Sequence, residues 1–522
     1  MTRLDKKDNQ IAMIFSLSDP SFISVLSDIA AREPERLFGT FNERPLTFGE
    51  LDRQAEALAN HLHRDLGILP GERAAVMMHN GPEAIAVLFA LAKTGIIWVP
   101  VNARQRGAGL KYILEHCEPA LLFTDTELWP VVVDSNAAFT GKTLLLGGER
   151  DTISKVLGGH DRLDAQVPHM SDLYALMYTS GTTGSPKGVR VTHAMMTYAL
   201  KSVGLLCSIR PGDIFFQWEP FYHIGGAQML LLPLFFDVQL ALTERFSASR
   251  FWGQVNASGA THIHYLGGVL QILLKQATSE LETTHKVRIA WGGGCPAEIW
   301  PTLKKRYGFD IRECYGMTEA SSLTTFNAEG RSGSVGRAVP WLNVAIHDDQ
   351  GSPVVTGKPG QIVVHETQPG VLFDGYFRNP SATAKALSDG MLHTGDRGWL
   401  DADGYLYFLG RMTDSVRCRG ENVSAWEVES VTQQHPDVEE CAMIGVDADV
   451  GEQDIKLFLK PKAGHALEPQ ELHNWLKERL ASYQCPRYFT VVEEFERTPS
   501  QRIIKHRLPT TRHDAWDSQQ NR

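Results

Sequence analysis

The sequence has few cysteines, and they form no recognisable pattern. Seven cysteines are scattered along 522 residues, and no two are spaced as Cys-x-x-Cys. An odd number without that spacing excludes a disulfide framework and a structural zinc site, and favours buried thiols in a reducing compartment. Long apolar runs are also absent, since no window approaches the ~18 residues of a membrane span. The charged first residues and the short apolar stretch from Ile11 to Phe15 do not fit a signal peptide, so we expect a cytoplasmic chain.

Basic residues are outnumbered by acidic ones. The chain has 51 Lys and Arg against 61 Asp and Glu, a net charge of −10, and no dense basic run. This balance argues against nucleic-acid partners, although it leaves room for a local basic site for phosphate groups. Disorder is excluded, because 43% hydrophobic and 21% charged residues suffice for a large buried core. At about 150 residues per domain, the length predicts roughly three to four lobes.

The order of apolar patterns predicts an α/β fold class. Strand patterns alternate with helix-length segments up to about residue 120 and again beyond about 170, which indicates two lobes on parallel sheets. Two of the expected helices span residues 51–66 and 225–236. After about residue 330, short alternating strands indicate a small β-barrel-like lobe. We expect an N-terminal domain over residues 1–410, a smaller α+β domain over 411–522, and a frayed tail after Pro509.

One segment combines glycine, hydroxyl groups and a lysine. It follows an apolar strand, is expected to precede a helix, and reads Tyr178-Thr179-Ser180-Gly181-Thr182-Thr183-Gly184-Ser185-Pro186-Lys187-Gly188. Its glycines let backbone N–H groups converge on one anion, and its lysine supplies charge for a β- or γ-phosphate. It is not a Walker loop, because Gly-Lys-Ser/Thr does not follow at the required distance. A flexible linker is the plain alternative. The predicted phosphate ligands are Thr179, Ser180, Gly181, Thr182, Thr183, Gly184 and Lys187.

Five further motifs occur along the chain. They are Leu46-Thr47-Phe48-Gly49-Glu50-Leu51, Tyr315-Gly316-Met317-Thr318-Glu319, Leu392-His393-Thr394-Gly395-Asp396, Gly410-Arg411 with Asp414, and Gly420-Glu421-Asn422-Val423. Together with the glycine-rich segment they resemble the adenylate-forming enzymes, which comprise acyl-CoA synthetases, amino-acid adenylation domains and firefly-type luciferases. The resemblance covers almost the whole chain. The segment from Gly420 to Glu427 is most similar to the carnitine/crotonobetaine-CoA ligase-like branch.

The resemblance implies a nucleotide site for ATP and Mg²⁺. In it, Thr318 and Glu319 would reach the α-phosphate and Mg²⁺, a cation that prefers oxygen ligands. Tyr315 would stack on adenine, and an ordinary core aromatic is the plain alternative. The remaining glycines of this site, whose backbone would approach the nucleotide, are Gly292, Gly293, Gly294 and Gly316.

The resemblance also implies a ribose site and a mobile C-terminal domain. Asp396 would accept both ribose hydroxyls and Arg411 would add a charged donor, with a structural ion pair as the alternative. The C-terminal domain of the family reorients between two half-reactions, and Asp414 stands at the hinge. Gly420 belongs to the second half-reaction.

The acyl site is implied around His223, in the segment Pro220-Phe221-Tyr222-His223-Ile224-Gly225-Gly226. In the family this histidine lies beside the acyl carboxylate and the thiol tunnel, whereas a lone histidine is often structural. The predicted substrate pocket adds Tyr265, Gly267 and Gly268, where adjacent glycines leave room for a bulky acid. His262 and His264 alternate on one expected strand, and without a third ligand nearby a core or pocket-lining role is favoured over a metal site.

The implied reaction activates a carboxylic acid in two steps. The acid attacks the α-phosphate of ATP, which releases pyrophosphate and gives an acyl-adenylate, and the thiol of coenzyme A then displaces AMP. Catalysis rests on positioning and on neutralising the charge at phosphorus. The predicted function is an AMP-forming acyl-CoA synthetase that uses ATP, coenzyme A and Mg²⁺.

One departure from the family lies near the C-terminus. The family carries a lysine in Pro-x-x-Gly-Lys, whereas this chain reads Pro499-Ser500-Gln501-Arg502, and Lys505 would need a register shift to serve instead. Either Arg502 acts as the catalytic cation in a complete ligase, or the protein only ligates an acyl-adenylate supplied by a separate adenylating enzyme. A luciferase-like oxygenase, the loading of a carrier protein and a non-catalytic nucleotide-binding module remain open.

Overall fold

The structure is a computed structural model. It describes residues 16–159, 167–179, 186–348, 350–412, 415–418, 421–448, 453–480, 482, 484–498 and 503–520. The chain divides into two compact units, the first comprising Met1–Val344 with Val364–Leu392 and the second Ala345–Val363 with His393–Arg522. Each unit is described by itself, and the predicted domain boundary at residue 410 stays a prediction. Among the described residues, no helix has the length and apolar character needed to cross a membrane.

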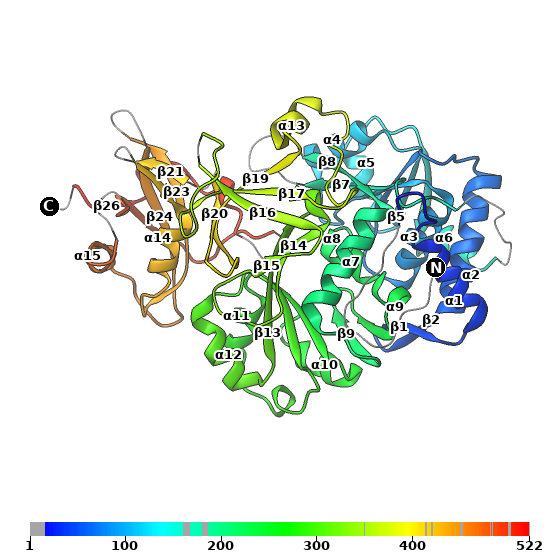
Figure 1. Cartoon of the computed structure of the whole chain (residues 1–522), viewed down its shortest axis with the longest axis horizontal. Helices are drawn as coiled ribbons and strands as arrows, with labels where there is room; N and C mark the ends of the chain where they lie inside the picture. Colours follow the sequence, from blue (N-terminus) through cyan, green and yellow to red (C-terminus); the bar gives the residue numbers. More distant parts are fainter. Residues whose placement is uncertain are drawn as a thin grey trace. The chain divides into compact units, whose positions relative to one another are not determined.

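The first unit contains a six-stranded sheet with the order β6-β5-β3-β4-β7-β8. Strands β5, β7 and β8 of this sheet are labelled in Figure 1. All its neighbouring strands are parallel except β7 and β8. The strands are β3 (Arg73–Met77), β4 (Ile97–Pro100), β5 (Leu121–Asp125), β6 (Lys142–Leu146), β7 (Leu173–Thr179) and β8 (Lys187–Thr192). The helices between them are α3 (Pro82–Thr94), α4 (Gly107–Cys117), α5 (Trp129–Asp134) and α6 (Ile153–Leu157). The predicted parallel α/β lobe is confirmed here.

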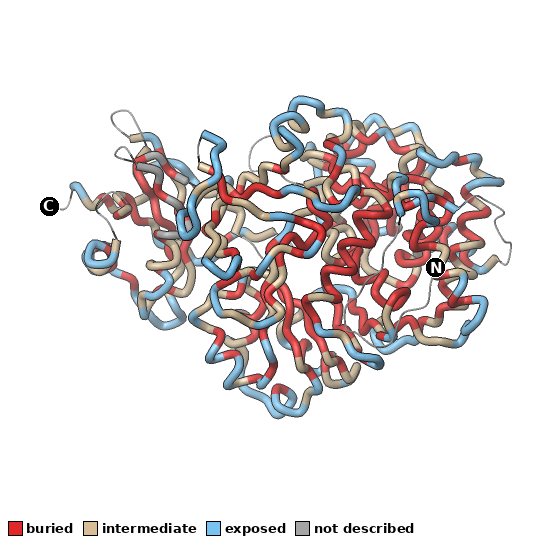
Figure 2. The backbone as a smooth tube through the Cα atoms, viewed as in Figure 1, coloured by how far each residue is buried: buried red, intermediate tan, exposed pale blue. Residues whose placement is uncertain are grey.

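A nine-stranded sheet makes up the rest of the first unit's core, in the order β15-β14-β13-β12-β11-β9-β10-β1-β2. Its strands are β1 (Leu37–Phe41), β2 (Arg44–Thr47), β9 (Asp213–Gln217), β10 (Val238–Leu242), β11 (His262–Leu266), β12 (Ile289–Gly293), β13 (Asp310–Met317), β14 (Ser322–Asn327) and β15 (Arg337–Ala338). The flanking helices are α1 (Ile23–Arg32), α2 (Phe48–Asn60), α7 (His193–Cys207), α8 (Ile224–Met229), α9 (Leu232–Phe235), α10 (Phe251–Ser258), α11 (Val269–Lys275) and α12 (Trp300–Tyr307). Figure 2 shows α7 and the central strands as buried segments.

Local chemistry explains where these helices begin and end. In α3, Pro82 occupies the first turn, where its missing N–H is not needed, and Gly95 ends the helix in the left-handed conformation with φ 68°. The predicted helix over residues 51–66 ends as an α-helix at Asn60 and continues as a π-turn from His61 to Asp65. The predicted helix over 225–236 is wrong as a single element. It is two helices, and Pro233 stands in the first turn of the second.

The element after the glycine-rich segment also differs from the prediction. A helix was expected to follow it from about His193, with no strand between the two, but Lys187 begins strand β8, which pairs antiparallel with β7. The sequence of β8, Lys-Gly-Val-Arg-Val-Thr, alternates with period two and places Val189 and Val191 in the core, and helix α7 begins only at His193. The segment therefore connects the two strands of a hairpin.

The second unit carries a four-stranded sheet, β23-β24-β25-β26, and most of a five-stranded sheet in the order β16-β17-β19-β18, with β20 paired to β19. The strands are β16 (Leu342–His347), β17 (Gly360–Glu366), β18 (Leu387–Ser388), β19 (Met391–Leu400), β20 (Leu406–Arg411), β21 (Ser415–Cys418), β22 (Glu421–Ser424), β23 (Val438–Asp447), β24 (Gln453–Pro461), β25 (Tyr488–Val491) and β26 (Trp516–Asp517). The helices are α14 (Ala425–Thr432) and α15 (Pro469–Lys477), while α13 (Pro380–Ala386) and strand β18 belong to the first unit. The α+β pattern predicted for this part of the chain is confirmed.

The end of the chain is ordered, so the predicted fraying after Pro509 is wrong for the described residues up to 520. Trp516 and Asp517 form β26 and pair with β25. The side chain of Lys456 is fully buried and donates to the carbonyls of Pro509 and Thr511 and to the carboxylate of Asp514. A polar composition concealed this attachment because its acceptors are mostly backbone carbonyls, which any sequence supplies.

Candidate functional site

The predicted phosphate loop closes the β7–β8 hairpin. Thr179, the last residue of β7, is the direct partner of Lys187, the first residue of β8. The loop therefore starts and ends at one rung of the sheet, and Lys187 lies at its exit. The other predicted phosphate ligands, Ser180, Gly181, Thr182, Thr183 and Gly184, lie outside the described residues.

A tyrosine outside the sequence motifs joins Lys187 to Glu319. The ammonium of Lys187 lies 5.1 Å from the centre of the Tyr376 ring. The hydroxyl of Tyr376 donates a hydrogen bond of 2.8 Å to Oε1 of Glu319. Lys187 and Glu319, which come from separate motifs far apart in the sequence, thus both contact the side chain of Tyr376. Tyr376 carries no sequence signal beyond an adjacent glycine, which explains why it was missed.

The Thr318–Glu319 pair lies on a short 3₁₀ turn, Thr318–Ala320, directly after β13. Thr318 is half-buried and Glu319 is 6% exposed. The tight approach before this turn requires glycine at position 316, because a Cβ there would lie 1.6 Å from the carbonyl oxygen of Ser322. The backbone carbonyl of Glu319 accepts the N–H of Phe373 at 2.9 Å, so the turn is held from outside its own strand.

The predicted purine loop, Gly292 to Gly294, spans the end of β12 beside β13, the strand that carries Tyr315. Glycine is required at 292, since a Cβ would lie 1.8 Å from the carbonyl oxygen of Tyr265. Tyr315 is 8% exposed. Gly293 accepts the N–H of Gly267 at 2.9 Å, which ties the purine loop to the predicted acyl pocket.

Glu313, which was not predicted as a site residue, binds the backbone of this loop through its side chain. Its carboxylate accepts the N–H groups of Gly294 at 3.2 Å and Cys295 at 2.7 Å, and the hydroxyl of Tyr265 at 2.8 Å. Burial raises the pKa of Glu313 to about 7, although these three donors oppose the shift. The carboxyl group that binds the loop therefore changes its protonation near neutral pH.

His223 is the residue before helix α8 and is half-buried, with its ring 4.7 Å from that of Tyr222. The turn after it requires small residues, because a Cβ at Gly226 would lie 2.2 Å from the carbonyl oxygen of Pro220. Among the other predicted pocket residues, Gly268 directly precedes α11, while the hydroxyl of Tyr265 is turned inward to Glu313.

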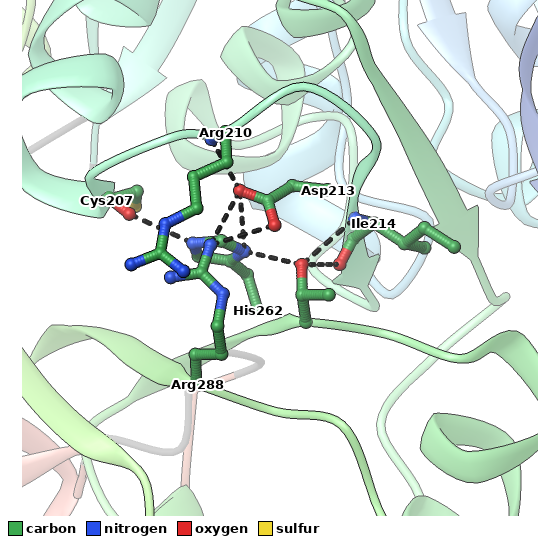
Figure 3. Close-up of polar contacts among 7 residues, drawn as sticks. Cys207, Arg210, Asp213, Ile214, His262 and Arg288 are labelled. Carbon is green, nitrogen blue, oxygen red and sulfur yellow. Dashed lines mark hydrogen bonds and ion pairs between the residues drawn. The ribbon is translucent and has the colours of Figure 1, made fainter. Parts of the chain in front are cut away.

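The two histidines of β11 have different surroundings. His262 is fully buried, stacks on Phe215 at 4.2 Å, and bonds the carbonyl of Cys207 and the hydroxyl of Thr261 (Figure 3). Figure 3 also shows Asp213 bound to Arg288 beside it. The expected core role of His262 is confirmed.

His264, two residues on, is buried beside the carboxylate of Glu219, with 3.4 Å between Nδ1 and Oε2. Burial lowers its pKa to about 3, so the imidazole is neutral at pH 7. Glu219 directly precedes the segment from Pro220 to Gly226 that contains His223. This buried polar pair therefore belongs to the surroundings of the predicted acyl site.

The predicted ribose pair lies in the second unit. Asp396 and Arg411 are direct partners across β19 and β20, and Arg411 Nε lies 3.6 Å from Asp396 Oδ1. Asp396 is 6% exposed, whereas the side chain of Arg411 is 41% exposed. The arrangement presents one buried carboxylate and one accessible guanidinium on the same face.

Three predicted residues of the C-terminal part, Asp414, Gly420 and Arg502, lie outside the described residues. Arg497 and Ile503, which lie on either side of Arg502 in the sequence, form an antiparallel bridge. Lys505 binds the carboxylate of Glu429 at 2.8 Å and 3.1 Å. Lys505 is thus engaged inside its own domain.

Comparison with known proteins identifies the family. The model of the AMP-binding enzyme family matches residues 26–377, and that of the AMP-binding enzyme C-terminal domain matches residues 427–502. The chain belongs to the AMP-binding enzyme family. Crotonobetaine/carnitine–CoA ligases of Salmonella paratyphi A and Escherichia coli O157:H7 are 30% and 29% identical to it. The alignments cover 89% and 88% of this chain and 93% and 92% of those relatives.

Solved structures of the family are similar over nearly the whole chain. O-succinylbenzoate coenzyme A synthetase (MenE) from Bacillus subtilis, in complex with AMP, has a TM-score of 0.82 and 26% identity, with 95% of this chain and 99% of that chain covered. The anthranilate CoA ligase AuaEII, in complex with anthranoyl-AMP, shares the fold with a TM-score of 0.85 at 24% identity, over 95% and 97% of the two chains. The predicted resemblance, its crotonobetaine/carnitine-CoA ligase-like branch, the fold class and the acyl-CoA ligase class are therefore confirmed.

Proposed function

We propose that the chain is a complete AMP-forming acyl-CoA ligase, which converts a carboxylic acid, ATP and coenzyme A into an acyl-CoA thioester, AMP and pyrophosphate. The observation that carries this proposal is the contact of Lys187 and Glu319 with one tyrosine, Tyr376, at the exit of the hairpin loop. A cation and a carboxylate held together there suit a nucleotide whose phosphates bind the cation directly and the carboxylate through a metal ion.

The first half-reaction replaces a poor leaving group with a good one. A carboxylate oxygen of the acid bonds to the α-phosphorus, and the bond from that phosphorus to the bridging oxygen breaks, so that pyrophosphate departs with the electron pair. Lys187 is proposed to bind the β- and γ-phosphates, and the loop from Gly292 to Gly294 to admit the purine beside Tyr315. These groups act by orientation and by neutralising charge.

Mg²⁺ fits the residues present. Thr318 and Glu319 offer adjacent hydroxyl and carboxylate oxygens, the ligands this cation prefers, and Glu319 is already oriented by the Tyr376 hydroxyl. When bound, the ion would neutralise phosphate charge. We assign Thr318 and Glu319 to hold it.

In the second half-reaction, the sulfur of coenzyme A bonds to the acyl carbon, and the bond from that carbon to AMP breaks. His223 is proposed to lie beside the reacting carboxyl group, and Asp396 with Arg411 to hold the ribose. Tyr265, Gly267 and Gly268 are proposed to border the acyl group. Asp414 is proposed as the hinge between the half-reactions, with Gly420 serving the second.

Arg502 is proposed as the cation that acts in the first half-reaction. Lys505, the alternative, already pairs with Glu429, and a shift of register would break that pair. This observation favours Arg502 over Lys505 as that cation. The complete ligase is proposed over a ligation-only enzyme that depends on a separate adenylating partner because arginine keeps the positive charge of the family's lysine. The odd number of cysteines, without Cys-x-x-Cys spacing, supports a reducing cytoplasmic setting.

Acid-dependent production of AMP tests the proposal. The protein is incubated with ATP, Mg²⁺, coenzyme A and a panel of short-chain, aromatic and trimethylammonium-bearing acids, because its relatives are named for crotonobetaine and carnitine. We expect AMP and acyl-CoA in equal amounts for at least one acid, and loss of both in Lys187→Met. Light emission or oxygen uptake in place of thioester would favour the luciferase-like alternative. Binding of AMP without turnover of either half-reaction would favour a nucleotide-binding module.

A further inference from the structure

We propose that Tyr376 is a positioning residue that sets both charged groups of the phosphate site, orienting Glu319 for the Mg²⁺–ATP complex and supporting Lys187 against its ring. This inference rests on the proposed use of ATP and adds a residue that none of the motifs contains. Tyr376 itself touches neither substrate nor metal in this account.

The contacts of Tyr376 differ in kind. Its hydroxyl donates to Glu319 Oε1 at 2.8 Å, while the face of its ring receives the Lys187 ammonium at 5.1 Å from the ring centre. Tyr376 is 9% exposed and Glu319 6%, so their hydrogen bond is shielded from water, and Lys187 is half-buried. A hydrogen bond to a buried carboxylate and a shielded cation–π contact are each stronger than their exposed counterparts.

Both contacts preserve charge. If a lysine and a glutamate form a direct ion pair, each loses most of its attraction for a ligand. A phenol, in contrast, restrains the carboxylate and the ammonium separately and neutralises neither. Tyr376 therefore contacts two opposite charges in a small site without neutralising either.

The backbone around Tyr376 is fixed, as a positioning role requires. Tyr376 bridges Val189 of strand β8, and its N–H donates to Thr383 Oγ1 at 2.9 Å. Phe377 N–H donates to the carbonyl of Gly188 at 2.8 Å. The ring is thereby attached to the strand that begins with Lys187.

The same segment is attached to Glu319 at its other end. The N–H of Phe373 donates to the backbone carbonyl of Glu319 at 2.9 Å. Upstream, Glu366 Oε2 accepts the N–H groups of Val371 and Leu372 at 3.1 Å and 3.0 Å. Residues 371–377 thus connect the exit of the phosphate loop to the turn that carries Glu319, and Tyr376 is the side chain through which both charges are held.

Two substitutions separate the two contacts. Tyr376→Phe keeps the ring beside Lys187 and removes the hydroxyl, whereas Tyr376→Leu removes both. Tyr198→Phe is the matched control, because it removes another buried tyrosine hydroxyl that donates to a side-chain oxygen, Oε1 of Gln368 at 3.2 Å. Thermal unfolding of all three variants shows whether each is folded.

The readout is ATP binding by calorimetry, measured once with Mg²⁺ and once with EDTA, which does not depend on turnover. We expect Tyr376→Phe to bind ATP about 10-fold more weakly with Mg²⁺ and within about twofold of wild type with EDTA, as for other residues that orient a metal ligand. Tyr376→Leu should weaken ATP binding in both media, and Tyr198→Phe should change neither.

Unchanged Mg²⁺–ATP affinity in Tyr376→Phe would overturn the inference while leaving the proposed function intact. An equal loss with Mg²⁺ and with EDTA would also overturn it, since that result indicates general damage to the site. A wild-type protein that binds ATP in neither medium would instead overturn the proposed function, and this inference with it.

Discussion

At the scale of single residues, Glu313 shows how burial changes a carboxyl group. Its side chain accepts three hydrogen bonds beneath the purine loop, yet burial raises its pKa from 4.5 to about 7. The folded protein therefore binds a proton between these two pH values that the unfolded chain releases. The free energy of unfolding must then fall as the pH rises from about 4.5 to about 7.

Replacement by glutamine should remove this dependence. Gln cannot ionise, so Glu313→Gln should flatten the fall in stability between pH 5 and pH 7.5. Its amide nitrogen cannot accept the N–H of Gly294 that the carboxylate accepts, so the variant should also lose some stability at every pH. Thermal unfolding across that range measures the effect. The exposed Glu298→Gln is the control and should leave the slope unchanged. Parallel stability curves for wild type and Glu313→Gln would contradict the assignment.

Arg502 and Lys505, near the C-terminus, are expected to have different roles that substitutions can separate. We expect Arg502→Ala to reduce acid-dependent pyrophosphate–ATP exchange by about 100- to 1,000-fold, because it removes a charge from the transition state. Arg502→Lys should restore exchange. Lys505→Ala should keep it and lower stability by no more than about 1 kcal/mol, since its pair with Glu429 is partly exposed. Loss of exchange in Lys505→Ala alone would show that Lys505 is the catalytic cation.

Sequence motifs identified the residues that carry charge but not those that hold them. Lys187 and Glu319 belong to sequence motifs that indicate phosphate binding, because phosphate binding needs particular groups at particular spacings. Tyr376 and Glu313 act through tertiary contacts with residues far away in the chain, and such contacts leave no local pattern. The same holds for the partner of Lys505, Glu429, which lies on another helix.

At the scale of elements, strands and helices with a clear period were predictable, and their connections were less so. The expected alternation of strands and helices is present in both large sheets, and helix α3 is followed by Gly95, as its sequence indicates. The hairpin of β7 and β8 was not predicted. The segment was expected to precede a helix, and the period-two alternation of Val189 and Val191 was not interpreted as a strand. The requirement for glycine where two backbone segments lie close together can, in contrast, be tested by single substitutions.

Gly292 and Gly253 make such a pair. A Cβ at Gly292 would lie 1.8 Å from the Tyr265 carbonyl oxygen, whereas a Cβ at Gly253, inside helix α10, meets nothing within 4 Å. We expect Gly292→Ala to lose about 1–3 kcal/mol of stability and to weaken AMP binding. Gly253→Ala should gain about 0.5–1 kcal/mol, because alanine favours a helix. Unfolding curves and AMP titration check both, and normal AMP affinity in Gly292→Ala would remove the purine loop from the site.

At the scale of the whole molecule, the candidate groups are divided between two compact units. Lys187, Glu319 and Tyr315 belong to the first, and Asp396 and Arg411 to the second. We propose that the two half-reactions use different orientations of the C-terminal domain, so that a chain defective in one half-reaction can retain the other. The account therefore stands on whether this chain performs the first half-reaction with arginine in place of lysine.

Separate assays of the two half-reactions decide this most directly. Pyrophosphate–ATP exchange is followed with the panel of acids and Mg²⁺, while preformed acyl-adenylates are supplied with coenzyme A and the thioester is detected by mass spectrometry. We predict exchange and thioester formation for the same acid, which would establish a complete ligase. Thioester from an adenylate without exchange for the corresponding acid would contradict the account and indicate a ligation-only enzyme that relies on a separate adenylating partner.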